Sequence, residues 1–255
     1  MRIFSVINID IVGSRRLKNR ELIQENLNNH MQKLNREFGD ILASPITFVL
    51  GDEWQIILRK PSKSYHIIAA FQKFLRKENI DIYAGIGIGT ISTDLYEDTR
   101  LMDGECFVKA REALNIVKNK NRFYNKELNS KKNNIYFNAK ELPFIEQYAL
   151  GSSTYKEVAL TSDDDKSNGV SINKIINTLI ENNEILKNKI TDKQLKIIEL
   201  YEELGSYNNI VKKSQDISKA DISQKLNSSN YFVIDNNNYL IESLLELYCA
   251  IRKGN

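Results

Sequence analysis

Cysteine, histidine and proline are scarce in this chain of 255 residues, which contains two, two and three of them respectively. The cysteines, Cys106 and Cys249, lie far apart in the sequence. Neither histidine, His30 or His66, has a cysteine or histidine neighbour at metal-ligand spacing. Because structural zinc needs four such ligands at suitable spacing, the sequence argues against a zinc site.

Long apolar runs are missing as well. The apolar start of the chain, from Ile3 to Val12, is interrupted by Asn8 and Asp10. No run approaches the ~20 residues that are needed to cross a bilayer. This stretch therefore predicts a buried strand rather than a secretion signal. We expect a cytoplasmic protein that has no membrane partner.

What remains is typical of a folded globular chain. Apolar residues make up 42% and charged residues 27% of the sequence, which excludes wholesale disorder. The net charge of +3 does not by itself indicate a nucleic-acid-binding protein. The length is sufficient for two compact domains.

The first half of the chain predicts alternating strands and helices. Leu27 and Leu34 belong to a stretch with apolar residues at helical spacing, and Pro61 is well placed to open a second helix. Two short apolar runs around Gly51-Asp52-Glu53 are typical of a hairpin. The predicted strands are 3–10, 46–50, 54–58 and 80–91, and the predicted helices are 18–38 and 61–75. This order is the ferredoxin-like, or split βαβ, plan of an α+β domain.

The second half predicts a different kind of module. A third helix over 104–117, a loop over 119–134 and a short strand over 135–138 complete the first domain, which we place at 1–160. A linker at 161–170 contains three consecutive aspartates, and a domain at 171–255 follows it. The predicted helices of that domain are 172–190, 193–204, 208–213 and 219–226, with an N-cap at Thr191 and a stop at Gly205. The runs 231–234 and 239–241 predict a small hairpin before a last helix, so the module is expected to be a winged helix-turn-helix.

Two aspartates carry the main functional prediction. In the split βαβ plan, the end of the first strand lies beside the start of the third, so Asp10 and Asp52 are expected to meet. Carboxylate oxygens suit Mg²⁺ or Mn²⁺, particularly when substrate phosphates complete the coordination. Either aspartate alone is better explained as a residue that stabilises a hairpin turn or caps the end of a strand. Together, with Gly13-Ser14 nearby, they favour a metal site.

The turn after Asp10 is the predicted nucleotide site. Backbone amides at a tight turn that leads into a helix can cradle a triphosphate, and neighbouring arginines add positive charge. The candidate nucleotide-binding residues are Ile11, Val12, Gly13, Ser14 and Arg15.

Several motifs resemble known families. Ile9-Asp10-Ile11-Val12-Gly13-Ser14 is similar to the first-strand motif of class III nucleotidyl cyclases. Leu50-Gly51-Asp52-Glu53-Trp54-Gln55 resembles their second metal motif and the GGDEF signature of diguanylate cyclases. Gly85-Ile86-Gly87-Ile88-Gly89 resembles the glycine-rich fourth strand of these palm domains. With Met102-Asp103-Gly104, Ala110-Arg111-Glu112-Ala113-Leu114 and the helix-turn-helix that follow, the order of motifs over nearly the whole chain looks like the SatD family. Because cyclase sites form between two subunits, the resemblance also implies a homodimer.

The catalytic helix departs from the cyclase pattern. The Asn and Arg that stabilise the transition state in class III cyclases would fall on Val108 and Glu112. Lys109 and Arg111 lie one residue away and are the candidate catalytic cations. The alternative is that both belong to a solvated helix face.

The tail carries the candidate DNA interface. Residues 217–226 resemble the recognition helix of sigma-factor-like helix-turn-helix domains, which enters the major groove of duplex DNA. The candidate DNA-binding residues are Ser218, Lys219, Asp221, Ser223, Gln224 and Lys225. From 190 to 255 there are eight basic and nine acidic residues, whereas DNA-binding domains usually carry a positive surplus. A module for dimerisation or protein contacts is the alternative.

Three functional hypotheses follow. The first is a SatD-like regulatory protein, in which a metal-dependent, nucleotide-binding palm domain is coupled to a DNA-binding helix-turn-helix. The second is an active nucleotidyl cyclase or nucleotidyltransferase that uses two metal ions. The third is a catalytically inert module that only contacts protein partners.

Overall fold

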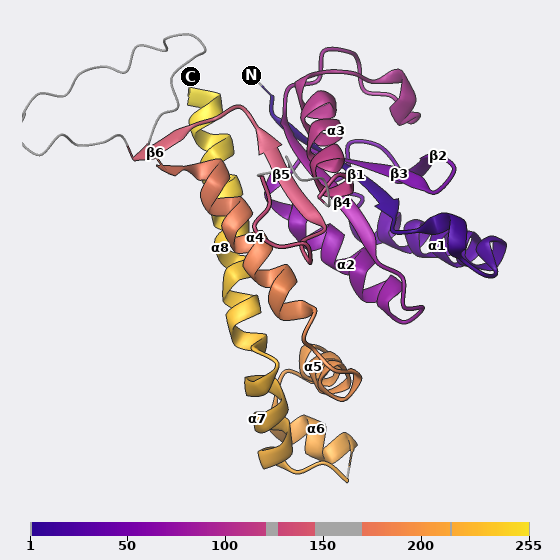
Figure 1. Ribbon diagram of the computed structural model, residues 1–255, viewed down its shortest axis with the longest axis vertical. Helices are drawn as coiled ribbons and strands as arrows, with labels where there is room; N and C mark the ends of the chain where they lie inside the picture. Colours follow the sequence, from indigo (N-terminus) through magenta and orange to yellow (C-terminus); the bar gives the residue numbers. More distant parts are fainter. Residues whose placement is uncertain (1, 121–126, 146–169, 215, 255) are drawn as a thin grey trace, which may run out of the picture.

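A computed structural model describes residues 2–120, 127–145, 170–214 and 216–254 (Figure 1). Strands and helices alternate up to Ala139, and from Ile172 onwards the described elements are helices. The strands are β1 (Phe4–Ile11), β2 (Thr47–Leu50), β3 (Glu53–Leu58), β4 (Ile82–Gly89), β5 (Ile135–Ala139), β6 (Pro143–Ile145) and β7 (Val170–Ser171). The α-helices are α1 (Arg20–Glu37), α2 (Ser64–Arg76), α3 (Glu105–Lys118), α4 (Ile172–Lys187), α5 (Asp192–Leu204), α6 (Tyr207–Lys213), α7 (Lys219–Ser228) and α8 (Tyr231–Gly254). Short 3₁₀ helices are η1 (Ser14–Arg16), η2 (Pro61–Lys63) and η3 (Thr99–Leu101).

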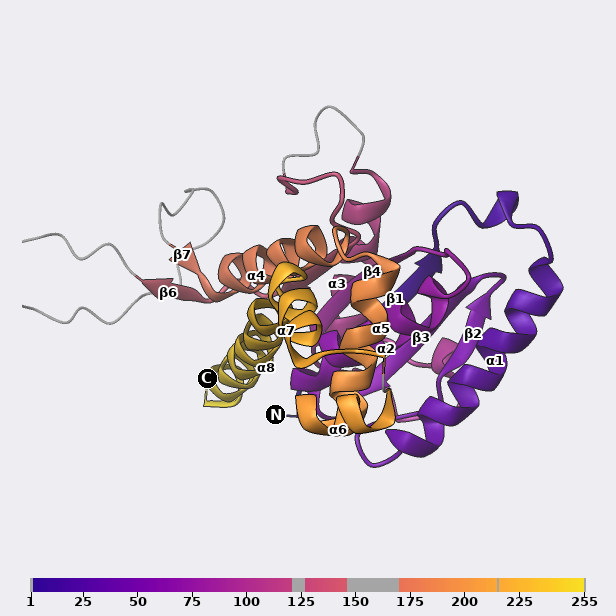
Figure 2. The same ribbon diagram turned by 90° about the horizontal axis from the view of Figure 1, so that it is seen from below.

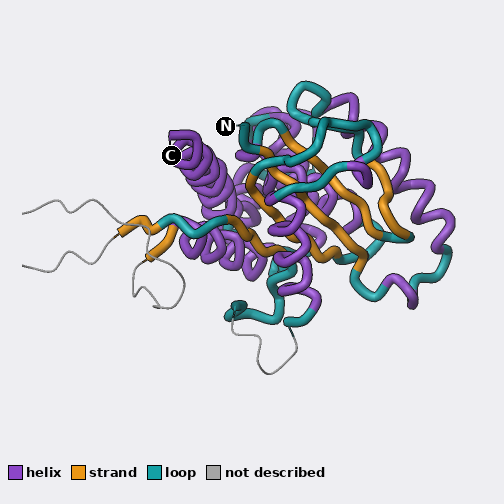
Figure 3. The backbone as a smooth tube through the Cα atoms, turned by 90° about the horizontal axis from the view of Figure 1, so that it is seen from above, coloured by secondary structure: helices purple, strands orange, loops and turns teal. Residues whose placement is uncertain are grey.

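The main sheet has the strand order β2-β3-β1-β4-β5. Neighbouring strands from β2 to β4 in this order are antiparallel, and β5 joins β4 in parallel. The predicted split βαβ order is therefore present, with the predicted short strand added at one edge. Figure 3 shows the strands as one layer with helices on both sides.

Each face of the sheet has its own helical cover because successive side chains of a strand point to opposite faces. Ile7 and Ile9 of β1 face the layer of α1 and α2, where they share a core with Leu27 and Phe71. Val6 faces the opposite layer, where α3 packs. Complete burial of such an aliphatic side chain contributes about 1.5–3 kcal/mol to the free energy of folding. Packing of helices on both faces therefore stabilises the sheet.

Helices α4 and α8 extend the layer of α1 and α2. Ile176 of α4 and Leu245 of α8 are buried in the same core cluster as the sheet residues. Tyr248 packs its ring against Phe137 of β5 and donates a hydrogen bond to the carbonyl of Lys140 at 2.8 Å. Figures 1 and 2 show α4 and α8 side by side next to the sheet, with α5, α6 and α7 gathered at their far end.

The predicted wing is wrong. Residues 231–241 belong to the continuous helix α8, not to a hairpin. The asparagine run at 236–238 favoured a turn, but Ile234, Ile241 and Leu245 recur at helical spacing and are buried. Asn237 and Asn238 hydrogen-bond Asn183 of α4, which ties the run into the helix pair.

The helices α5, α6 and α7 form a small separate core around Ile198, Ile210 and Leu226. The bounds of these helices agree with the predicted ones within one or two residues, while their assignment as a helix-turn-helix stays a prediction. Residues 161–169 of the predicted linker lie outside the described residues, and the division into domains at 1–160 and 171–255 stays a prediction. Among the described residues, every helix is too short or too polar to span a membrane.

The start of α5 allows a test of the tail fold. The Thr191 hydroxyl accepts a hydrogen bond from the Gln194 amide, and the Gln194 side chain accepts one from the Thr191 amide at 2.8 Å. We expect Thr191→Ala to lower the free energy of unfolding by about 1 kcal/mol because it removes this cap. Chemical denaturation measures the change. The exposed neighbour Lys193→Ala is the control, and equal stability of both variants would contradict the capping role.

Candidate functional site

The carboxylate pair lies at one end of the two central strands. Asp10 is the last but one residue of β1 and pairs with Glu53 of β3, and Asp52 stands in the β2–β3 turn one residue earlier. The side chains of Asp10 and Asp52 lie close enough to form a hydrogen bond with each other when one of them is protonated. Residues 42 positions apart are thus brought together by the strand pairing, as the sequence predicted. Asp10, Asp52 and Glu53 are hereafter called the carboxylate edge.

Proximity changes the acidity of both aspartates. Burial raises the pKa of Asp10, the ammonium of Lys118 opposes this effect, and the negative charge of Asp52 adds to it. Burial also acts to raise the pKa of Asp52, but hydrogen bonds from Ser14 and Asp10 and the charge of Arg20 outweigh it, so that pKa is lowered. As the pH rises, Asp52 therefore loses its proton before Asp10 does.

Cations surround the carboxylate edge. Lys118, at the end of α3, places its Nζ 2.5 Å from Asp10 Oδ2, and Arg20, at the start of α1, places Nη2 3.4 Å from Asp52 Oδ1. Arg111 of α3 places Nη1 2.6 Å from Glu53 Oε1. These three side chains come from both sides of the aspartate pair, so the edge is close to neutral despite its three carboxylates.

The two candidate catalytic cations have different surroundings. Arg111 belongs to the carboxylate edge through its ion pair with Glu53. The Lys109 ammonium instead contacts Glu112 at 3.0 Å, and Glu112 also accepts a hydrogen bond from Asn138 of β5 at 2.8 Å. The structure therefore brings Arg111, but not Lys109, to the carboxylate edge, where it pairs with Glu53.

The predicted nucleotide turn follows β1 directly. Ile11 is still in the strand, and the Val12 amide donates to the carbonyl of Asp81 at 2.9 Å. Gly13 has a φ of 66°, a left-handed conformation that glycine adopts without strain, and it opens η1. Within the described chain, no backbone acceptor contacts the amides of Gly13, Ser14 and Arg15. Those three amides are the ones that a phosphate could use.

The donor set at the edge fits Mg²⁺ or Mn²⁺ better than zinc. No group of three or more His, Cys, Asp or Glu side chains that could hold a metal ion occurs among the described residues. Mg²⁺ keeps several waters and is commonly held by one or two carboxylates together with substrate phosphates. Asp10 and Asp52 would supply these two carboxylates, and Lys118 would have to leave Asp10 when the ion enters.

The candidate DNA-binding residues lie on α7 and at its start. Ser218 is the N-cap, since its hydroxyl accepts a hydrogen bond from the Asp221 amide. Asp221 and Lys225 form an ion pair with each other, while Lys219 and Gln224 are exposed. Ser223 is half-buried, and its hydroxyl accepts a hydrogen bond from Asn227. Lys219 and Gln224 are therefore the side chains of this helix that are best placed to reach DNA.

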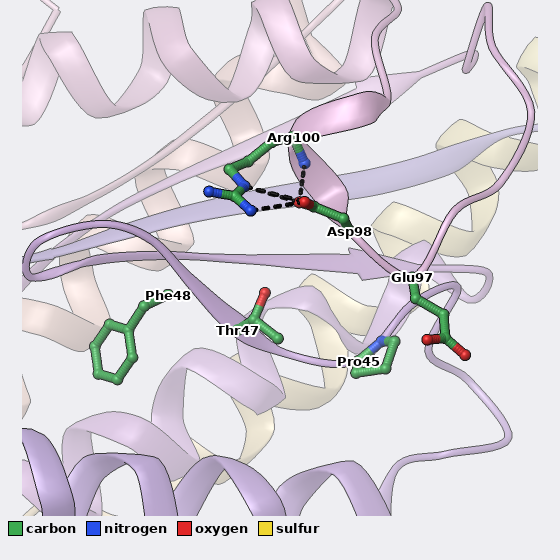
Figure 4. Close-up of a pocket in the computed structure, with 6 residues that line it drawn as sticks. All are labelled: Pro45, Thr47, Phe48, Glu97, Asp98 and Arg100. Carbon is green, nitrogen blue, oxygen red and sulfur yellow. Dashed lines mark hydrogen bonds and ion pairs between the residues drawn. The ribbon is translucent and has the colours of Figure 1, made fainter.

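A cavity of about 320 Å³ lies elsewhere, between β2 and η3 (Figure 4). Arg100 and Asp98 form an ion pair with each other at its rim. None of the candidate site residues lines this cavity. Its lining residues are Pro45, Thr47, Phe48, Glu97, Asp98 and Arg100.

Sequence reasoning missed three members of the site. Lys118 and Arg20 were assigned no role, and Glu53 was noted only as part of the hairpin motif. Strand pairing offers a signal for Glu53, because the residue next to Asp52 must stand opposite Asp10. Lys118 lies seven residues after Arg111, which is two turns along the same face of α3.

Solved structures with some likeness to the chain are nucleotide cyclase domains. The catalytic core of a rhodopsin-guanylyl cyclase with converted specificity, in complex with ATPalphaS, is 13% identical, with a TM-score of 0.31 over 45% of this chain and 72% of that one. The guanylate cyclase domain of RhGC from Catenaria anguillulae in complex with GTP is 11% identical, with the same TM-score and coverage. The adenylyl cyclase CyaB from P. aeruginosa is 19% identical, with a TM-score of 0.29 over 43% of this chain and 70% of that one. TM-scores this low carry no argument about function.

The sequence comparisons are more specific. A search among curated proteins gave no match. The family model of the SatD family matches residues 4–142, which include β1 to β5, the carboxylate edge and α3. Since this match covers more than half of the chain, the protein belongs to the SatD family.

Proposed function

We propose that this protein is a cytoplasmic, homodimeric regulatory protein whose palm domain binds a nucleoside triphosphate together with Mg²⁺ or Mn²⁺. Its helix-turn-helix binds double-stranded DNA. The observation that carries the first part is the meeting of Asp10 and Asp52 at the end of β1, within a ring of cations. Two adjacent carboxylates repel each other, and a divalent cation bound between them would remove this repulsion.

The residues around the pair have distinct roles in this proposal. Asp10 and Asp52 hold the metal, which neutralises charge on the phosphates. The amides of Gly13, Ser14 and Arg15 bind the phosphate chain from one side, and Ile11 and Val12 fix the turn that presents them. Lys118, released from Asp10, contacts phosphate from the other side. Arg111 lies next to Glu53 and is the cation best placed to stabilise a leaving phosphate if the nucleotide is turned over.

Calorimetric titration tests this part. Each of the four common nucleoside triphosphates is titrated into the full chain with Mn²⁺ and then with a chelator, and the products are analysed afterwards. Metal-dependent binding without a product would favour a sensor. Release of pyrophosphate, abolished in Arg111→Gln but kept in Lys109→Gln, would favour the nucleotidyl cyclase or nucleotidyltransferase. If the protein binds none of the four triphosphates, the remaining hypothesis is a catalytically inert module that contacts protein partners.

The surface charge of the tail supports DNA binding more than its sequence suggests. Four of the nine acidic residues after 190 form ion pairs with lysines of the N-terminal palm domain. The pairs are Glu199 with Lys77, Glu202 with Lys73, Glu242 with Lys63 and Glu246 with Lys60. One of the eight basic residues, Arg252, is likewise paired with Glu105 of α3. Of the remaining seven basic and five acidic residues, Lys213 pairs with Glu203 and Lys225 with Asp221, which leaves five basic and three acidic residues for other contacts. This surplus of positive charge is what a DNA-binding surface needs.

Lys219→Ala tests DNA binding. We expect it to weaken binding to all duplexes alike and to reduce the salt dependence by about one phosphate contact, because a lysine at the start of α7 would meet the backbone. Fluorescence anisotropy with a labelled duplex at several salt concentrations measures both effects. Lys253→Ala, exposed at the end of α8, is the control. If the wild-type protein binds no duplex even at low salt, the DNA-binding part fails.

A further inference from the structure

The outer side of α8 carries an apolar stripe that nothing in the described chain covers. Val233, Leu240 and Leu247 are 50%, 38% and 41% exposed, at intervals of seven residues. Leu244 and Ile251 lie between them and are only partly buried. Steps of four and three residues along one side of a helix are the pattern by which a helix packs against another helix.

The charges of α8 are kept away from this stripe. Glu242 and Glu246 lie on the opposite flank, where they meet Lys63 and Lys60 beside η2. Arg252 points to Glu105 of α3. Asn236, Ser243 and Ala250, which lie beside the stripe, are uncharged.

The neighbouring helix α4 continues the same surface. It lies alongside α8 in both Figure 1 and Figure 2. Ile175, Leu179 and Leu186 are partly exposed at steps of four and seven residues. The acidic residues of α4 point inward, since Glu181 binds the Ser130 amide and Glu184 binds Tyr65. The two helices together present a pair of apolar ridges, here called the outer α4–α8 face.

We propose that the outer α4–α8 face is the contact between two copies of this chain, packed as a four-helix bundle. The residues of the two ridges are all apolar, so the ridges of two copies can meet across a two-fold axis without bringing like charges together. The heptad-like spacing on α8 suits a helical partner with the same spacing. A second copy supplies such a helix.

The size of the face sets the strength of this contact. Two helices about 10 Å wide, over roughly 28 Å of length, give a footprint of roughly 500 Å² per copy. The total of roughly 1,000 Å² lies just below the range of stable specific interfaces. The dimer is therefore a weak one that depends on concentration. The dimer would also contain two helix-turn-helix modules, as a protein that binds two DNA half-sites requires.

This contact differs from the cyclase-like homodimer, which would form through the palm. It neither requires a working nucleotide site nor includes a residue of the carboxylate edge, which lies at the end of β1 and the start of β3. Its failure and the failure of the proposed nucleotide binding are therefore separate results.

Sedimentation velocity over a wide range of protein concentrations tests the proposal. We expect the wild type to shift from monomer to dimer with rising concentration. Leu240→Glu and Leu247→Glu each place like charges in the contact and should raise the dimer dissociation constant by roughly 100-fold or more. Both side chains are partly exposed, so the fold should persist, and circular dichroism checks this. Tyr239→Glu, 70% exposed on the same helix but off the stripe, is the matched control.

Three outcomes would overturn the proposal. The wild type could stay monomeric at every concentration. It could form a dimer that neither glutamate variant weakens, which would point to another surface such as the palm. Or Tyr239→Glu could weaken the dimer as much as Leu240→Glu, which would mean that the stripe itself is not the contact.

Discussion

Replacing Asp10 with asparagine is expected to abolish metal-dependent stabilisation by nucleoside triphosphates while leaving the metal-free protein at least as stable as the wild type. Asparagine keeps the hydrogen bond to Asp52 but removes one negative charge from a buried pair. Because the pKa of Asp10 is raised in the folded state, the wild type loses stability as pH rises from the ordinary value of 3.8 through the raised one. The variant has no such loss.

Thermal unfolding at neutral pH, with and without Mn²⁺ and nucleotide, measures both effects. A ligand at 100 times its dissociation constant stabilises the folded state by about 2.7 kcal/mol. For a chain of this size that corresponds to about 5–10 °C in the wild type. The variant should show no shift. Asp98→Asn, an exposed aspartate paired with Arg100, is the control and should keep the full shift. A full shift in Asp10→Asn would show that the nucleotide binds elsewhere.

Alanine at Gly85 or Gly87 is expected to destabilise the palm strongly. A Cβ at Gly85 would overlap the backbone of Ala110 and Leu114 in α3, and one at Gly87 would overlap that of Cys106 and Ala110. Backbone cannot rotate away as a side chain can, so α3 must move off the sheet. We expect a loss of about 3 kcal/mol for each substitution, the upper part of the range for overpacked cores.

Urea denaturation of both glycine variants tests this prediction. Gly254→Ala is the control, since a Cβ there meets nothing within 4 Å. The same displacement of α3 would carry Arg111 and Lys118 away from the carboxylate edge, so weaker nucleotide binding should accompany the lost stability. Variants as stable as the control would show that α3 does not pack as closely on β4 as described.

The palm could be predicted from sequence because local signals and topology agree there. Apolar residues at helical spacing predicted the helices, and the Gly51-Asp52 turn predicted the β2–β3 hairpin. The split βαβ order then brought Asp10 to Asp52 without further information. The glycine-rich motif of β4 lies where α3 packs most closely, since no Cβ would fit at Gly85 or Gly87.

The rest of the chain depends on contacts between distant segments, which sequence spacing does not reveal. Lys118 is an ordinary lysine at a helix end until α3 docks and places it on Asp10. The asparagine run in α8 has a local preference for a turn, and packing against α4 overrides it. The net charge of the tail was misleading for the same reason, because its glutamates pair with lysines more than a hundred residues away in sequence.

Titration of Mn²⁺ followed by electron paramagnetic resonance tests the central claim most directly. The signal of free Mn²⁺ reports how much ion stays unbound in the presence of wild-type protein and a nucleoside triphosphate. Our account predicts that the protein–nucleotide mixture binds more Mn²⁺ than the nucleotide alone, and that the excess disappears in the double variant Asp10→Asn, Asp52→Asn. An excess that survives in the double variant would contradict the assignment of the metal site to these two aspartates.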